Sequence, residues 1–134
     1  MKITRLTICD WHGQGKTDTV IEHPSWPDIE AAIRALNNQN LNDIHLEIEG
    51  QPEKFLTVGG GDGKYIVSGS INATAFPTLV DLSVQEEPHV NLIVGGQLAD
   101  FPAQYVVDLD RALTAARSVA ETGNFAEKIG WTYV

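Results

Sequence analysis

The feature that constrains the fold most is a series of strand-like segments that follow one another across short turns. The clearest is residues 43–49, DIHLEIE, whose side chains alternate between two faces. Ile44, Leu46 and Ile48 share the first face, and His45, Glu47 and Glu49 share the second. Such alternation is typical of an antiparallel strand with one buried face and one face in water. Parallel neighbours would need longer crossover connections.

Further strands are predicted by runs of β-branched and aromatic residues between turn signals. Residues 3–11 and 17–23 form a predicted hairpin, and residues 54–70 form two strands around the glycine-rich turn GGGDG. Three more strands are predicted at residues 76–84, 89–96 and 103–108.

Two segments have the periodicity of amphipathic helices. In residues 24–38, PSWPDIEAAIRALNN, Ser25 and Asp28 are spaced as a capping box and Pro27 suits the first turn. In residues 108–123, DLDRALTAARSVAETG, Asp108 or Asp110 suits the N-terminus and Gly123 suits a left-handed C-terminal cap. The apolar face of the second helix is rich in alanine, which lets another element approach closely.

Together these elements predict the α+β class. We expect one antiparallel sheet of six or seven strands, with both helices packed on it. We also expect Phe125 and Trp131 to be mostly buried near the second helix, because the chain must turn back after Gly123. The 134 residues suit one domain, residues 1–134, large enough to bury a core without metal or disulfide support.

The charge of the chain bears on its partners. The formal net charge is −9. Nucleic acids and anionic membranes are therefore poor direct partners, because binding them requires clustered lysine and arginine. The single cysteine, Cys9, excludes a disulfide within the chain, and residues 1–11 lack the apolar run of a signal peptide. We expect a soluble, cytoplasmic protein.

The stretch WHGQGKTDTV, residues 11–20, contains the Gly-Lys-Thr ending of a phosphate-binding P-loop. Asp10 stands where that motif has its first glycine, and a strand rather than a helix is predicted after Lys16. We therefore interpret the stretch as a hairpin loop. The turn GGGDGK fails the P-loop and dinucleotide patterns as well, so no cofactor is predicted.

No catalytic or metal-binding motif is evident. The four histidines lie on separate segments without HxH or HExxH spacing, although a cluster formed by folding stays open. Glu47 and Glu49 share a strand face and are interpreted as solvated. Cys9 lies in an apolar pattern and is interpreted as a small buried hydrophobe. We therefore predict that the protein is not an enzyme.

The order of several motifs resembles a known family. LTVGGGDGKYIVSGS is followed by VGGQLADFPAQYVVDLDRALTAARSVAETG and then by IGW. The first half adds an early Trp-Gly loop and the PSWPDIEAAIRAL helix. In this order the motifs resemble the immunity protein family numbered one among bacterial polymorphic toxin systems, over nearly the whole chain.

The resemblance implies a toxin-neutralising immunity protein, made beside a toxin and binding its toxin domain in the producing cell. Many toxins paired with this family are nucleic-acid deaminases or nucleases. A basic cleft in such a toxin would complement an acidic inhibitor. From the residues themselves, acidic and aromatic side chains on predicted turns are the candidate contacts. They are Asp62, Tyr65, Glu86, Glu87, Asp100 and Phe101.

Two other functions stay open at this point. A small-molecule-binding module would have a deep pocket between sheet and helices that gathers several polar groups. A self-associating structural domain, forming a homo-oligomer, would have a large apolar patch with two-fold complementarity.

Overall fold

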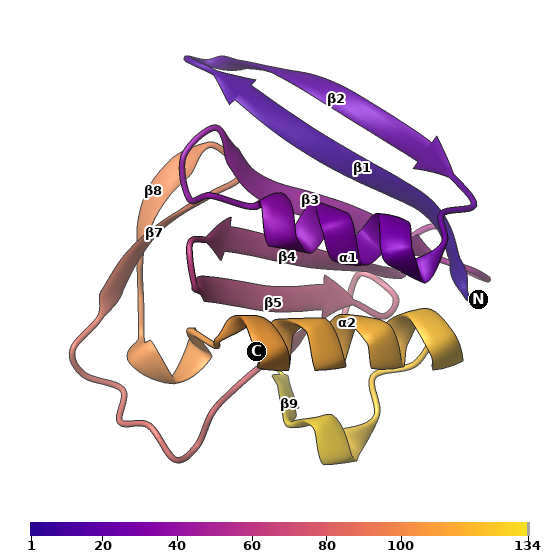
Figure 1. Cartoon of the computed structure of the whole chain (residues 1–134). Coiled ribbons are helices and arrows are strands. Elements are labelled where there is room, and N and C mark those ends of the chain that lie inside the picture. Colours follow the sequence, from indigo (N-terminus) through magenta and orange to yellow (C-terminus); the bar gives the residue numbers. More distant parts are fainter. Residues whose placement is uncertain (134) are drawn as a thin grey trace.

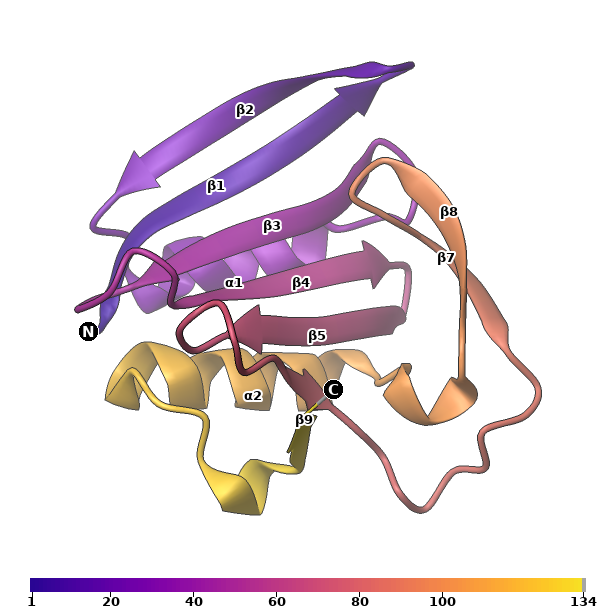
Figure 2. The ribbon, with the colours of Figure 1, turned by 180° about the vertical axis from the view of Figure 1, so that it is seen from behind.

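The computed structural model describes residues 1–133 and contains a seven-stranded sheet with both helices on one face (Figures 1 and 2). All neighbouring strands are antiparallel, and their order is β2-β1-β3-β4-β5-β6-β9. Their bounds are β1 Ile3–His12, β2 Gly15–Glu22, β3 Leu41–Ile48, β4 Phe55–Gly61, β5 Lys64–Ser70, β6 Pro77–Leu79 and β9 Trp131–Tyr133. The predicted α+β class is confirmed.

A second, two-stranded sheet departs from the prediction of a single sheet. It consists of β7 (Val90–Val94) and β8 (Gln97–Phe101). The sequence QLADF was not predicted as a strand, because its polar residues obscure the alternation. Conversely, the predicted strand at residues 103–108 was wrong: Ala103–Tyr105 form a 3-10 turn after Pro102. The predicted strand at residues 76–84 contracts to the three residues of β6.

The first predicted helix is confirmed as α1, Trp26–Ala35. The backbone N–H of Asp28 donates to Ser25 Oγ over 3.3 Å, and the N–H of Ser25 donates to Asp28 Oδ2 over 2.9 Å. This reciprocal pair is a capping box, which satisfies two N–H groups near the helix start. It fixes where α1 begins.

The second predicted helix is confirmed as α2, Leu109–Thr122. The Asp108 carboxylate accepts a hydrogen bond from the backbone N–H of Arg111 over 2.8 Å, and Gly123 ends the helix in the left-handed conformation, at φ 72°. The alanines of its apolar face are fully buried, which lets the helix backbone lie close to the sheet. Within residues 1–133 neither helix is long and apolar enough to cross a membrane.

The hydrophobic core lies between the helices and the inner face of the sheet. Leu6, Leu46 and Leu56 point inward from adjacent strands and have no exposed surface. Ile29 and Ile33 of α1 cover them from the other side and are equally buried. The alternation predicted from residue 44 onward is confirmed, because Ile44, Leu46 and Ile48 are buried whereas His45 and Glu47 are partly exposed.

The C-terminal segment closes one end of this core. Phe125 and Trp131 are half-buried and pack against the core, with their rings edge to face at a centroid distance of 5.0 Å. Trp131 belongs to β9, the edge strand beside β6. Both aromatics pack against the core, but they are half-buried and not mostly buried as predicted.

Candidate functional site

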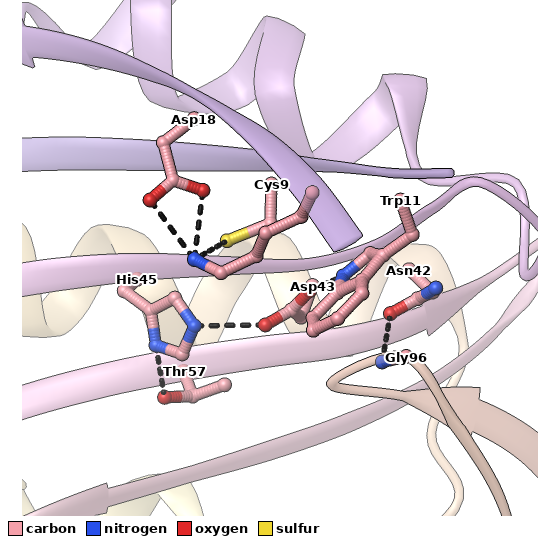
Figure 3. A network of polar contacts seen from close by, with 9 residues as sticks. Cys9, Trp11, Asp18, Asn42, Asp43, His45, Thr57 and Gly96 are labelled. Carbon is pink, nitrogen blue, oxygen red and sulfur yellow. Dashed lines mark hydrogen bonds and ion pairs between the residues drawn. The ribbon is translucent and has the colours of Figure 1, made fainter. Parts of the chain in front are cut away.

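Two surface features outside the core are candidates for function. The first is a polar network on the outer face of the sheet, the face opposite the helices (Figure 3). At its centre is Asp43 of β3, which is only 3% exposed. Trp11 donates its indole N–H to Asp43 Oδ1 over 2.8 Å, and His45 Nε2 lies 2.8 Å from Asp43 Oδ2. Both carboxylate oxygens of this buried acid are therefore engaged, as its burial requires.

Strand register brings the neighbours of Asp43 together. Cys9 of β1 is paired directly with Asp43, and Thr57 of β4 is paired with His45. The second ring nitrogen of His45, Nδ1, lies 3.1 Å from Thr57 Oγ1. The alternation of this strand predicted that His45 is a solvated side chain on a polar face. The spacing of Asp43 and His45, two apart on one strand, was the available signal that they share a face.

The network also determines the reactivity of Cys9. Its side chain is fully buried, and its Sγ, the Asp43 carboxylate and a His45 ring nitrogen all lie within 4.8 Å of one another. Burial, reinforced by the negative charge of Asp43, raises the pKa of the Cys9 thiol to about 11. The thiol is then protonated at neutral pH and is not an activated nucleophile. The prediction of a buried Cys9 is confirmed.

Lys16 of the Gly-Lys-Thr stretch lies on the same face. Lys16 lies within β2 rather than in the loop, so the loop interpretation holds only for the turn at residues 13–14. Its Nζ donates to the Asp18 carboxylate over 2.7 Å and lies 3.7 Å from Cys9 Sγ. The extended backbone that carries Lys16 cannot form a helix N-terminus at a phosphate.

We therefore expect no ATP binding in the micromolar range, measured by calorimetric titration. Replacement of Lys16 with alanine should leave the heat of ATP addition unchanged, because that side chain interacts with Asp18 and Cys9 and contributes to no phosphate cradle. Micromolar ATP binding that is lost in Lys16→Ala would contradict this expectation.

A shallow groove adjoins the network on the outer face. It has a volume of about 730 Å³ and crosses β2, β1, β3 and β4. Its lining residues are Arg5, Thr7, Asp18, Val20, Glu22, His45, Glu47, Pro52, Phe55 and Thr57. Arg5 is paired with Glu22 and Glu47 across it. The groove lies on the open side of the sheet, whereas the small-molecule hypothesis placed a pocket between sheet and helices.

The second feature is residues 81–101, here named the acidic arm, which comprises the loop after β6 and the β7–β8 hairpin. Figures 1 and 2 show the loop extending away from the sheet and the hairpin arching beside it. No lysine or arginine occurs in residues 65–110, which include the whole arm. The side chains of Glu87 and Asp100 are 81% and 62% exposed. The arm is therefore acidic and open to solvent.

Apolar side chains are exposed among these carboxylates. Leu82 is 83% exposed, Leu98 is 70% exposed and Val84 is 40% exposed. Single exposed leucines are ordinary on a protein surface. Two leucines and a valine exposed on one short segment without lysine or arginine give that segment both apolar and negatively charged surface.

The hairpin of the acidic arm is anchored to the sheet. Leu92 is 1% exposed, and the N–H of Ile93 donates to Asn38 Oδ1 over 2.7 Å. At the hairpin turn, the N–H of Gly96 donates to Asn42 Oδ1 over 3.0 Å (Figure 3). A Cβ on Gly96 would lie 2.5 Å from the Trp11 ring, so only glycine permits this close approach. The arm is thereby held in a defined position.

The loop of the arm is fixed at both ends. Arg111 Nη1 lies 3.2 Å from Asp81 Oδ2. Hydrogen bonds from Ser83, together with the nearby Arg111, lower the pKa of the Asp81 carboxyl. At the far end, the backbone N–H of Ala103 donates to the carbonyl of Glu86 over 2.9 Å.

The structure brings together four of the six predicted contact residues. Glu86 and Glu87 lie in the loop of the arm, and Asp100 and Phe101 lie in β8. His89 links the two parts, since its ring nitrogens lie 3.5 Å from Glu87 Oε1 and 3.0 Å from Asp100 Oδ2. Phe101 is half-buried, whereas Glu86 is exposed.

The other two predicted contacts lie outside the arm. Asp62 is exposed in the β4–β5 turn. Tyr65 is only 3% exposed and belongs to the core, so its assignment as a surface anchor was wrong. Its ring points to the inner face because Tyr65 and Val67 are two apart on β5. Sequence alone suggested a turn residue because Tyr65 directly follows the glycine-rich turn.

Comparisons with protein-family models, curated proteins and solved structures found no match to this chain. The resemblance to the immunity protein family therefore remains a prediction from the sequence motifs.

Proposed function

We propose that this chain is a toxin-neutralising immunity protein that acts in the cytoplasm and binds its cognate toxin domain through the acidic arm. The observation that carries the proposal is the composition of the arm: exposed carboxylates and exposed leucines on a segment without lysine or arginine. A toxin that acts on nucleic acid, such as a deaminase or nuclease, needs a basic cleft, and this surface is complementary to such a cleft.

Each part of the arm has a distinct physical task in this proposal. The exposed carboxylates attract a basic partner over distance and raise the association rate. Leu82 and Leu98 lose their contact with water when the partner covers them, which slows dissociation. The anchoring of the hairpin by Asn38 and Asn42 limits the conformational entropy lost on binding.

Charge reversal in the arm tests the proposal. The partner used is the toxin domain encoded beside this chain, and binding is measured by surface plasmon resonance at several salt concentrations. The Glu86→Lys, Glu87→Lys double variant should lower the association rate constant at low salt by about 10-fold or more. It should also weaken the salt dependence of that rate. The thermal unfolding midpoint should stay near that of the unsubstituted chain, because both side chains are exposed.

A matched control separates a local contact from an effect of net charge. Glu53 and Glu127 are also exposed, and they lie outside the arm. The Glu53→Lys, Glu127→Lys variant changes the net charge by the same amount. It should slow association much less than the arm variant. Equal slowing by both variants would refute the arm as the contact surface.

If binding survives the arm reversals, and reversals at Asp62 and Asp100, within about a factor of two, the contact surface lies elsewhere. The outer face of β3, with His45 and Glu47, would then be the surface to test next, together with the neighbouring exposed Glu49. Absence of any binding between the chain and the neighbouring toxin domain would refute the proposed function itself.

A further inference from the structure

Cys9, Asp43 and His45 place three different kinds of metal ligand at one point of the outer face. A sulfur, a carboxylate oxygen and a ring nitrogen lie within 4.8 Å of one another. We propose that these three side chains bind one divalent transition-metal ion of the zinc type. Thiolate, imidazole and carboxylate are the ligands that zinc takes in proteins, and sites with three protein ligands leave a fourth position for water.

The groups around these three side chains orient them for this role. Trp11 holds Asp43 Oδ1 over 2.8 Å, which leaves Oδ2 directed at the cluster (Figure 3). Thr57 Oγ1 lies 3.1 Å from His45 Nδ1. When Nδ1 carries the ring proton and donates to Thr57, the Nε2 lone pair faces the cluster. Such secondary hydrogen bonds are what metal-ligating carboxylates and histidines usually have.

Binding requires a defined exchange of protons. In the metal-free protein His45 Nε2 and Asp43 Oδ2 lie within hydrogen-bond distance, 2.8 Å apart. The metal takes the place of this contact at Nε2, and the ring proton is then carried on Nδ1 toward Thr57. The Cys9 thiol loses its proton to solvent and binds as the thiolate. No electron is transferred, and the proton released is that of the Cys9 thiol.

The His45–Asp43 pair needs only a small adjustment to share one ion, whereas Cys9 Sγ lies within 4.8 Å of both and must approach the ion as it binds. At zinc–ligand distances of about 2.0 Å, tetrahedral coordination separates nitrogen and oxygen ligands by about 3.3 Å. His45 Nε2 and Asp43 Oδ2 now lie 2.8 Å apart. The His45 side chain is 43% exposed and lines the groove, so its ring can rotate outward by this amount. Among the three ligands only His45 lines the groove, so an ion would reach the buried Cys9 and Asp43 from the His45 side.

Lys16 is the competitor for this site. Its ammonium lies 3.7 Å from Cys9 Sγ and is held there by Asp18. A positive charge at this distance repels a divalent cation. Because the Lys16 side chain is 37% exposed, it can swing into solvent. Removal of its charge should therefore strengthen metal binding, an effect that a non-specific surface site would not show.

The test is a titration of the full chain with Co²⁺, which reports thiolate coordination through a near-ultraviolet charge-transfer band. The unsubstituted chain should show this band with a stoichiometry of one ion. Lys16→Gln should lower the apparent Kd for Co²⁺ by about 10-fold, as expected for loss of a nearby like charge. Thr57→Val should raise it by about 10-fold. Cys9→Ser should abolish the band.

Matched variants show whether all three ligands act together. His45→Ala and Asp43→Asn should each weaken binding by at least about 10-fold, whereas His12→Ala should have no effect, since His12 lies outside the cluster. Circular dichroism confirms that each variant is folded. Absence of the band in both the unsubstituted chain and Lys16→Gln would overturn the proposal. Retention of full affinity in His45→Ala would do so as well, because it would show that His45 is not a ligand.

Discussion

Replacing Gly61 with alanine is expected to lower the free energy of unfolding by about 3 kcal/mol or more. Gly61 ends β4 at φ 129°, a conformation that residues with a side chain rarely adopt. A Cβ there would also lie 2.4–2.5 Å from backbone atoms of Leu36 and Asn37. Backbone cannot rotate aside as a side chain can, so the end of α1 must separate from the sheet.

Gly63 is the matched control for this prediction. It lies two residues further along the same turn, also has a positive φ, of 89°, and has open space where its Cβ would be. Gly63→Ala should therefore lower the free energy of unfolding only by the backbone strain, about 1–2 kcal/mol. Urea denaturation, followed by circular dichroism, measures both values. Equal losses for the two variants would show that the contact with Leu36 and Asn37 is unimportant.

Leu46→Ala is expected to lower the free energy of unfolding by about 2–5 kcal/mol. Leu46 lies on β3, at the middle of the sheet, and none of its surface is exposed. Its neighbours Leu6 and Leu56 belong to the adjacent strands, and they cannot close the cavity without disturbing the strand pairing. Loss of apolar contact and the residual cavity both contribute to the cost.

Leu98→Ala removes the same atoms from a residue that is 70% exposed and should change the free energy of unfolding by less than about 0.5 kcal/mol. A comparison of urea midpoints tests the pair. A loss of more than about 1 kcal/mol in Leu98→Ala would mean that the acidic arm contributes to the fold itself. The same variant is then useful in the toxin experiment, where Leu98 is expected to contribute to binding only.

The two proposals can fail independently. The proposal for the acidic arm concerns recognition of a protein. It rests on the exposed carboxylates of the arm and on its exposed leucines. The proposal for a metal site concerns three side chains on the sheet. It rests on the distances between them and on their hydrogen bonds. They meet only where Gly96 packs on Trp11, whose indole holds Asp43. A cobalt titration and a toxin-binding assay therefore answer different questions.

The sequence alone determined the elements whose signals are local. The capping box of Ser25 and Asp28, the Asp108 cap and the Gly123 stop each depend on residues a few positions apart. The alternation in β3 likewise predicted its buried face. The exposure of the candidate contact residues Glu86, Glu87 and Asp100 was predicted for the same reason, because turn chemistry and charge are properties of short segments.

Tertiary structure decided everything that depends on register and on packing between distant segments. QLADF became β8 because its backbone pairs with β7, and Tyr65 became a core residue because of the face on which β5 places it. The cluster of Cys9, Asp43 and His45 exists because β1 and β3 align Cys9 with Asp43, across 34 positions of sequence. A shift by one residue would send these side chains to opposite faces, and no local pattern fixes that register.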